Sequence, residues 1–138
     1  MSSQTLSLRS GRDPGHVIKH KAITDTTPVS LIVEMSQADL FSLELAWTGT
    51  LAADLNVYMS NSYNPNPTDP QNEAIALRAG NWISTGSRYL TDWASPNGSP
   101  GASEIHGANV ECCYLKFVIL PTDGAGTLDG YLSGKSIG

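Results

Sequence analysis

The chain has 138 residues, which is the usual length of a single domain. Hydrophobic residues make up 40% and charged residues only 15%, and 13 Asp and Glu against 8 Lys and Arg give a net charge of -5. No run of helix-forming residues is long enough for a long helix, and no apolar stretch approaches the ~20 residues of a membrane span. The net acidity argues against a general nucleic-acid binder. We therefore expect a domain of strands and turns, with neither membrane nor nucleic acid as its partner.

The charge is divided unevenly along the chain. Residues 1–21 hold four basic residues and one acid, Asp13, which gives +3, and the other 117 residues hold four basic and twelve acidic residues, which gives -8. Because residues 11–15 (Gly-Arg-Asp-Pro-Gly) break regular structure, we predict an extended N-terminal arm over residues 1–15 and a β-sandwich domain over residues 16–138. Either the arm is a solvated, frayed terminus, or it docks on a negatively charged partner. The basic residues for such a contact are Arg9, Arg12, Lys19 and Lys21.

The first half of the chain contains four predicted strands. Residues 17–23 and 29–35 are rich in β-branched and apolar residues, as strands are. In residues 40–47 apolar side chains alternate with Ser, Glu and Ala, which is the period of a half-buried strand. Because a slip of one residue would bury Glu44, the register should be firm. Residues 55–60 alternate in the same way, and we expect 40–47 and 55–60 to pair as an antiparallel hairpin.

The second half of the chain contains a long loop and further short strands. Residues 61–72 include three prolines, which exclude a central strand, and residues 71–79 fit either a short helix or an edge strand. Residues 105–110 predict a weak strand, and in residues 112–120 Cys113, Leu115, Phe117 and Ile119 should share one face. Residues 127–133 should return beside that strand as a second hairpin. About eight short strands, with a turn every ten residues or so, predict an all-β, antiparallel β-sandwich of jelly-roll type.

The sequence contains no recognisable catalytic motif. It has no Gly-x-Ser-x-Gly elbow, no phosphate-binding glycine loop and no His-Glu-x-x-His. His106, as a general base, would need an orienting acid. His16 and His20 are four residues apart, but the Pro-Gly before them and the β-branched residues between them disfavour the helix that would align them as metal ligands. We expect no catalytic, cofactor-binding or metal site, and a binding protein rather than an enzyme.

The two cysteines are adjacent in the sequence. Side chains of neighbouring strand residues point to opposite faces, so a disulfide between Cys112 and Cys113 would strain the backbone. We expect two free thiols in a reducing compartment.

The aromatic residues offer a possible contact surface. Three Trp and five Tyr are enough for a module that stacks on sugars or anchors a protein interface. Core packing is the simplest role for Trp47 and Trp82. Trp93, beside a predicted loop, is the candidate exposed aromatic residue.

Five segments together resemble a known family. They are residues 39–49 (Asp-Leu-Phe-Ser-Leu-Glu-Leu-Ala-Trp-Thr-Gly), 55–61 (Leu-Asn-Val-Tyr-Met-Ser-Asn), Trp82, 113–120 (Cys-Tyr-Leu-Lys-Phe-Val-Ile-Leu) and 124–135 (Gly-Ala-Gly-Thr-Leu-Asp-Gly-Tyr-Leu-Ser-Gly-Lys). Over about residues 29–135 this layout is similar to that of the jelly-roll cement, or decoration, proteins on the heads of tailed bacteriophages. The loop rich in Asn and Pro and residues 84–111 depart from the family pattern.

The resemblance implies a structural virion protein that binds the outer surface of a phage capsid, cements neighbouring major capsid subunits and stabilises the head. It implies assembly in the host cytoplasm, no cofactor, and two partners: the major capsid protein and the chain itself, as a dimer or a trimer. In that setting the four basic residues would meet acidic capsid patches. The competing interpretation is a carbohydrate-binding or fibre-associated module on the virion surface, with Trp93 at its contact. A small hydrolase that uses His106 is a third.

Overall fold

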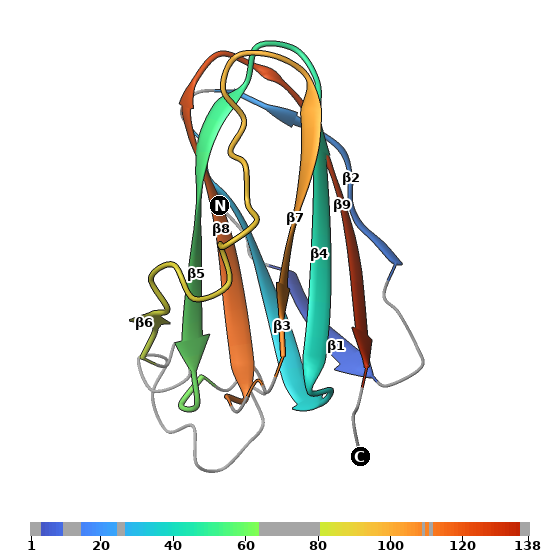
Figure 1. Ribbon diagram of the computed structural model, residues 1–138, viewed down its shortest axis with the longest axis vertical. Helices are drawn as coiled ribbons and strands as arrows, with labels where there is room; N and C mark the ends of the chain where they lie inside the picture. The colour runs from blue at the N-terminus through green and yellow to red at the C-terminus, as the bar shows by residue number, and fades with distance from the viewer. Residues whose placement is uncertain are drawn as a thin grey trace.

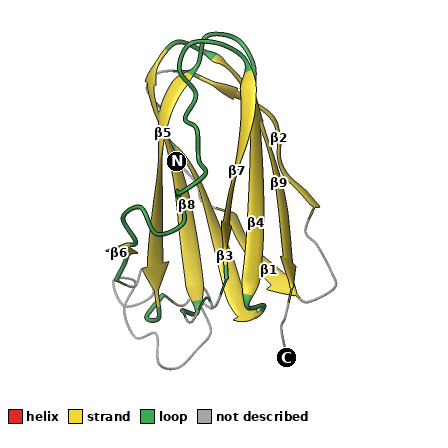
Figure 2. Ribbon diagram, viewed as in Figure 1, coloured by secondary structure: helices red, strands yellow, loops and turns green. Residues whose placement is uncertain are grey.

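The computed structural model describes residues 4–9, 15–24, 27–63, 81–108, 110 and 112–135. For residues 4–9, 36, 37 and 135 the description covers the backbone only. In this part of the chain every regular element is a strand (Figure 2). The strands are β1 (Gln4–Arg9), β2 (Gly15–Ile23), β3 (Val29–Gln37), β4 (Leu40–Trp47), β5 (Ala52–Ser60), β6 (Ile83–Ser84), β7 (Gly101–Gly107), β8 (Tyr114–Asp123) and β9 (Gly126–Lys135).

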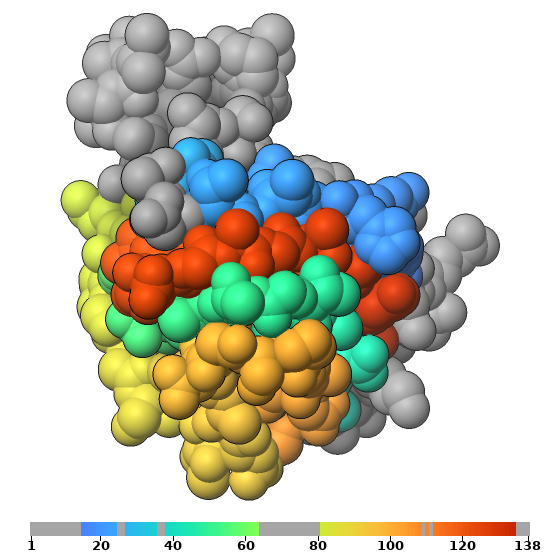
Figure 3. All heavy atoms as spheres, turned by 90° about the horizontal axis from the view of Figure 1, so that it is seen from above, coloured from blue at the N-terminus to red at the C-terminus, as the bar shows by residue number. Residues whose placement is uncertain are grey.

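Strands β2 to β9 form the jelly-roll sandwich that the sequence predicts. One sheet has the order β2-β9-β4-β7, and the other has the order β3-β8-β5-β6 with β1 added outside β3. Consecutive strands change sheet at every step from β2 to β9, except between β5 and β6, and this alternation is the jelly-roll order. The two sheets run along the long axis of the molecule (Figure 1). Seen from above, the neighbouring blue, red, green and orange bands are β2, β9, β4 and β7, in the order of the four-stranded sheet (Figure 3).

Both predicted hairpins are wrong, because their strands lie in opposite sheets. Residues 40–47 form β4, which pairs with β7 and β9, whereas residues 55–60 belong to β5, which pairs with β8 and β6. Strands β8 and β9 are separated in the same way. An alternating sequence shows that a strand has one buried face, and that face needs a second layer to cover it. Here the chain crosses the core after β4 and after β8, so that the next strand, β5 or β9, belongs to the opposite sheet.

The core lies where the alternation predicts it. On β4 the apolar positions are buried and Glu44 is exposed, while on β8 Leu115, Phe117 and Ile119 are buried. Phe41 of β4 and Phe117 of β8 meet between the sheets, with ring centroids 5.4 Å apart. The predicted register of residues 40–47 is therefore confirmed.

The cysteines are free thiols, as predicted, but their orientation is not the predicted one. Cys112 is buried and Cys113 is exposed, although the alternation placed Cys113 on the core face. The reason is that β8 begins only at Tyr114, and the two cysteines lie in a bend before it. The backbone N–H of Cys113 donates to Asn61 Oδ1 at 2.8 Å, which fixes this bend.

The described part of the predicted arm belongs to the protein's own sheet. Residues 4–9 are extended, as expected, and form β1, which runs parallel to β3 with Thr5 opposite Ile32. Its backbone hydrogen bonds therefore go to β3 of the same chain. Arg12 and residues 71–79, for which a helix or an edge strand was expected, lie outside the described residues.

Two chain crossings hold each other at one end of the sandwich. The connection from β4 to β5 meets the connection from β8 to β9: the Thr50 N–H donates to the Ala125 carbonyl at 2.8 Å. The Thr48 N–H donates to the Thr127 carbonyl at 3.0 Å, and the hydroxyls of the same two threonines are 2.7 Å apart. A Cβ at Gly124 would collide with the Thr50 carbonyl, and Gly124 also has a φ of 71°. Only glycine fits this contact.

Gly124→Ala should therefore lower the free energy of unfolding by roughly 3 kcal/mol, since it adds a steric collision to the cost of a left-handed backbone. Gly98→Ala is the matched control, because Gly98 has a φ of 93° but open space around its Cα. That variant should lose only about 1–2 kcal/mol. Urea unfolding measures both changes, and equal losses would contradict the close approach of the two crossings.

Candidate functional site

Strand β2 carries two of the four basic residues selected from the sequence. Lys19 and Lys21 are both exposed, and β2 is an edge strand that pairs only with β9. Lysine on an edge strand opposes the addition of another strand. This edge therefore presents positive charge, rather than backbone hydrogen bonds, to a partner.

The other two basic residues belong to the segment before β2. Arg9 is the last residue of β1, and its side chain lies outside the description, as does Arg12. β1 is the edge strand of the other sheet and contacts β9, the neighbour of β2. The first two strands of the chain are thus edges on the same side of the sandwich.

Two histidines of β2 converge on one carboxylate of β9. His16 Nε2 lies 2.7 Å from Asp129 Oδ1, and His20 Nδ1 lies 2.8 Å from Asp129 Oδ2. The backbone N–H of His20 also donates to Oδ1 at 2.9 Å. These contacts leave the Asp129 side chain only 12% exposed. Tyr131 stacks on the His16 ring with centroids 4.5 Å apart. We call His16, His20 and Asp129 the histidine clasp.

The backbone of β2 is distorted where it forms the clasp. The register with β9 shifts between His16 and Ile18 and again between Ile18 and Lys21, so β2 carries an extra residue at each place. His20 has a φ of 45°, and it is the only non-glycine residue with a positive φ in the described chain. Bulges re-aim side chains, and here they turn both imidazoles toward Asp129.

The clasp keeps its carboxylate ionised. The backbone N–H of His20 has the largest effect in holding the pKa of Asp129 below its usual value, and the two imidazoles lower it further. Burial acts in the opposite direction. The clasp therefore holds a negative charge on β9, next to the strand β2 that carries the two exposed lysines.

Trp93 is half-buried and packs against the protein itself. Its ring meets the buried Trp47 edge to face with centroids 5.9 Å apart, and its indole N–H donates to Ser95 Oγ at 2.8 Å. Trp47 is core, as expected. Trp82 is instead half-buried on the outer face of the five-stranded sheet, where the Lys116 ammonium lies 4.5 Å from its ring centroid.

Further aromatic side chains surround Lys116 on that outer face. The Tyr58 ring lies 5.7 Å from the Lys116 ammonium, and Tyr63 contacts both Trp82 and Tyr114. Burial lowers the pKa of Lys116. The Tyr114 hydroxyl donates to Glu34 at 3.2 Å, and burial, followed by this carboxylate, raises the pKa of Tyr114 to about 12.

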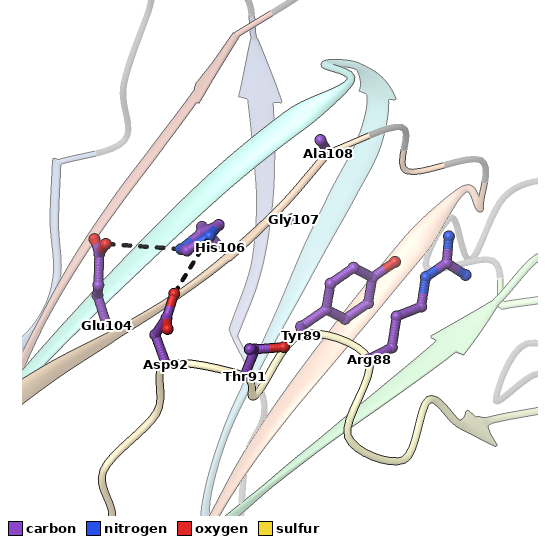
Figure 4. Close-up of a pocket in the computed structure, with 8 residues that line it drawn as sticks. All are labelled: Arg88, Tyr89, Thr91, Asp92, Glu104, His106, Gly107 and Ala108. Atoms are coloured by element: carbon purple, nitrogen blue, oxygen red, sulfur yellow. Dashed lines mark ion pairs between the residues drawn. The ribbon is translucent and has the colours of Figure 1, made fainter.

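His106 borders a cavity of about 230 Å³ beside β7 (Figure 4). Its Nδ1 lies 3.7 Å from Glu104 Oε1 and its Nε2 lies 3.9 Å from Asp92 Oδ2, and all three side chains are more than half exposed. Two carboxylates, the kind of group that orients a general base, therefore lie near the ring. At 3.7 and 3.9 Å both carboxylates lie beyond hydrogen-bond distance of the ring, and the three side chains form an exposed charge cluster.

The described residues offer neither a metal-ion site nor a membrane-spanning helix. No group of three or more His, Cys, Asp and Glu side chains among them is arranged to hold a metal ion. The same part of the chain has no helix with the length and hydropathy to cross a membrane.

Comparison with known proteins supports the fold. No protein-family model matches this sequence, and no curated protein is similar to it in sequence. CorA, a surface-associated copper-binding protein important in copper acquisition by Methylomicrobium album BG8, aligns over 97% of this chain and 98% of its own, with a TM-score of 0.54 and 12% identity. PliG of Aeromonas hydrophila, a periplasmic inhibitor of g-type lysozyme, aligns over 96% of this chain and 98% of its own, with a TM-score of 0.41 and 12% identity. The likeness to CorA places this chain among β-sandwich proteins and shows the fold alone.

Asp129→Asn should reduce stability in a pH-dependent way. Because the folded-state pKa of Asp129 is lowered, its charge stabilises the fold above the unfolded value of about 3.9 and ceases to do so as the pH falls through the folded value. The variant should melt several degrees below the parent at pH 6, and the difference should shrink below pH 4. Asp54→Asn, which removes an exposed carboxylate of β5, is the control. A difference that stays constant from pH 3 to 7 would place the loss in packing rather than charge.

Proposed function

We propose that this protein is a structural virion protein that binds the outer surface of a phage capsid, cements neighbouring major capsid subunits and stabilises the head. It acts as a binding protein and not as an enzyme. It is made in the host cytoplasm and assembles as a homo-oligomer, a dimer in the first instance and a trimer in the second. The resemblance of residues 29–135 to phage cement proteins supports the proposal, and so does the jelly-roll sandwich that those proteins share.

The observation that carries the proposal is a basic edge strand on an acidic body. Lys19 and Lys21 are exposed on β2, in the segment of +3, while the rest of the chain carries -8. A local positive patch favours an acidic protein surface. Each exposed ion pair contributes only about 0.2–1 kcal/mol, but a homo-oligomer that binds through several linked copies multiplies weak contacts by avidity.

Charge reversal at β2 tests this contact. Lys19→Glu should weaken binding to phage heads assembled without this protein by roughly tenfold, because it replaces attraction by repulsion. Arg88→Glu is the matched control, since Arg88 is exposed away from β2 and the change in charge is the same. Co-sedimentation and the heat resistance of the heads are the measurements.

Equal weakening by both variants would contradict a specific role for β2, and no binding of the parent protein would remove the cement proposal. Deletion of residues 1–15 is a less direct test, because β1 completes the protein's own sheet.

A carbohydrate-binding module on the virion surface is the second candidate. The observation that favours it is the aromatic cluster of Tyr58, Tyr63, Trp82 and Tyr114 around Lys116 on one sheet face. Aromatic rings on a sheet can stack on sugars, whereas Trp93 already packs on Trp47.

Trp82→Ala and Trp93→Ala form a matched pair for a glycan-array experiment. If the protein binds glycans, Trp82→Ala should abolish the signal because it removes a stacking ring, and Trp93→Ala should retain it. Absence of any glycan signal from the parent protein would reject this candidate.

A further inference from the structure

The histidine clasp lies within the edge strand that carries the proposed partner contact. His20 stands between Lys19 and Lys21 in the sequence and is 81% exposed on its side chain. With neutral histidines, the two lysines and Asp129 sum to +1. With both histidines protonated, the same edge sums to +3. The proton uptake of two imidazoles can therefore raise the summed charge of Lys19, Lys21 and the clasp from +1 to +3.

The described charged groups around the clasp are few. On β2 they are the two lysines, and on β9 the charged group is Asp129, beside the neutral Tyr131, whose ring stacks on His16. On β4, Glu44 stands opposite Tyr131, and on β7, Glu104 stands opposite Glu44; both are exposed and line one hollow with Tyr131. Asp129 is the carboxylate that contacts both imidazoles directly, and it is the group that faces them most closely.

Protonation adds charge to the clasp without breaking its contacts. A neutral imidazole donates one N–H, and each ring already directs one nitrogen at Asp129. An imidazolium keeps that N–H and gains a proton on its other nitrogen. The carboxylate remains ionised throughout this range because its pKa is lowered. Imidazole changes charge between about pH 5 and 8.

We propose that the histidine clasp is a pH-dependent charge switch, which raises the positive charge of the β2 edge and tightens its hold on an acidic protein surface as the pH falls. The partner class rests on the proposed function, and the switch itself rests on the geometry of the clasp. His20 stands between the two lysines in the sequence, and the bulges of β2 turn both imidazoles toward Asp129, so that their charge acts on the same partner.

The test uses variants that keep the clasp but cannot titrate. In the double variant His16→Gln/His20→Asn, each amide can donate to Asp129, and Asn tolerates the left-handed backbone at position 20. His106→Gln is the matched control, because it removes the third histidine, which lies on β7 at the far edge of the same sheet. Circular dichroism and thermal melting verify the folding of each variant.

The probe is immobilised poly-L-aspartate, which stays charged at both pH 5.5 and pH 7.5. At fixed ionic strength the parent protein and His106→Gln should bind the probe about tenfold more tightly at pH 5.5 than at pH 7.5. The affinity of the double variant should differ less than twofold between the two pH values. The affinity of the single variant His20→Asn should differ about threefold between the two pH values. This variant replaces the double variant in the test if the double variant does not fold. No binding by the parent, no pH dependence, or full pH dependence in the double variant would overturn the switch.

The same comparison with phage heads separates this inference from the proposed function. Heads that bind equally at both pH values, together with no pH response on poly-L-aspartate, would reject the switch and leave the cement role intact. A pH response on poly-L-aspartate without any binding to heads would support the switch and reject the cement role.

Discussion

The sandwich depends on the contact between its two chain crossings, from β4 to β5 and from β8 to β9. A chain that leaves one sheet for the other loses its strand partners, so its backbone groups need new ones. Thr48, Thr50 and Thr127 supply them mutually, through backbone and hydroxyl hydrogen bonds. Because Gly124 and Gly126 let the two backbones touch, β4 is fixed beside β9 and β5 beside β8. The contact thus sets the central pair of strands in each sheet, and β2 adds beside β9 at the edge.

The position of β2 explains why its backbone can be so irregular. An inserted residue in a central strand would disturb two neighbours, whereas β2 pairs only with β9. The two bulges and the left-handed His20 are therefore tolerated there, and three hydrogen bonds to Asp129 compensate for them. Strain of this kind persists only where the surroundings determine it. The clasp is thus a consequence of the jelly-roll order as much as of the local sequence.

The alternation along residues 40–47 and 115–119 was sufficient to predict strands, their buried faces and the sandwich class, because these features depend on local periodicity. Strand pairing was not predictable in the same way, because the partner of β4 is β9, more than 80 residues further along the chain. The clasp was missed for the same reason: Asp129 is 113 residues from His16, and two histidines four residues apart share a face on a helix but not on a regular strand. Trp93 lies beside a loop, as predicted. The sequence could not show that the Trp93 ring packs on the ring of Trp47.

The acidic body and the basic edge have opposite effects on a negatively charged partner, and distance decides between them. Neighbouring strands lie about 4.8 Å apart, so Glu44 on β4 is roughly 10 Å from β2 and Glu104 on β7 roughly 14 Å. The Debye length is about 8 Å at physiological ionic strength. A partner that touches β2 therefore experiences Lys19 and Lys21 at close range, while the acids of the far strands are screened. At low salt the net charge of -5 acts over longer distances and opposes the approach. The charge pattern thus selects an approach along the β2 edge, and it acts only once the partner is within about one Debye length of that edge.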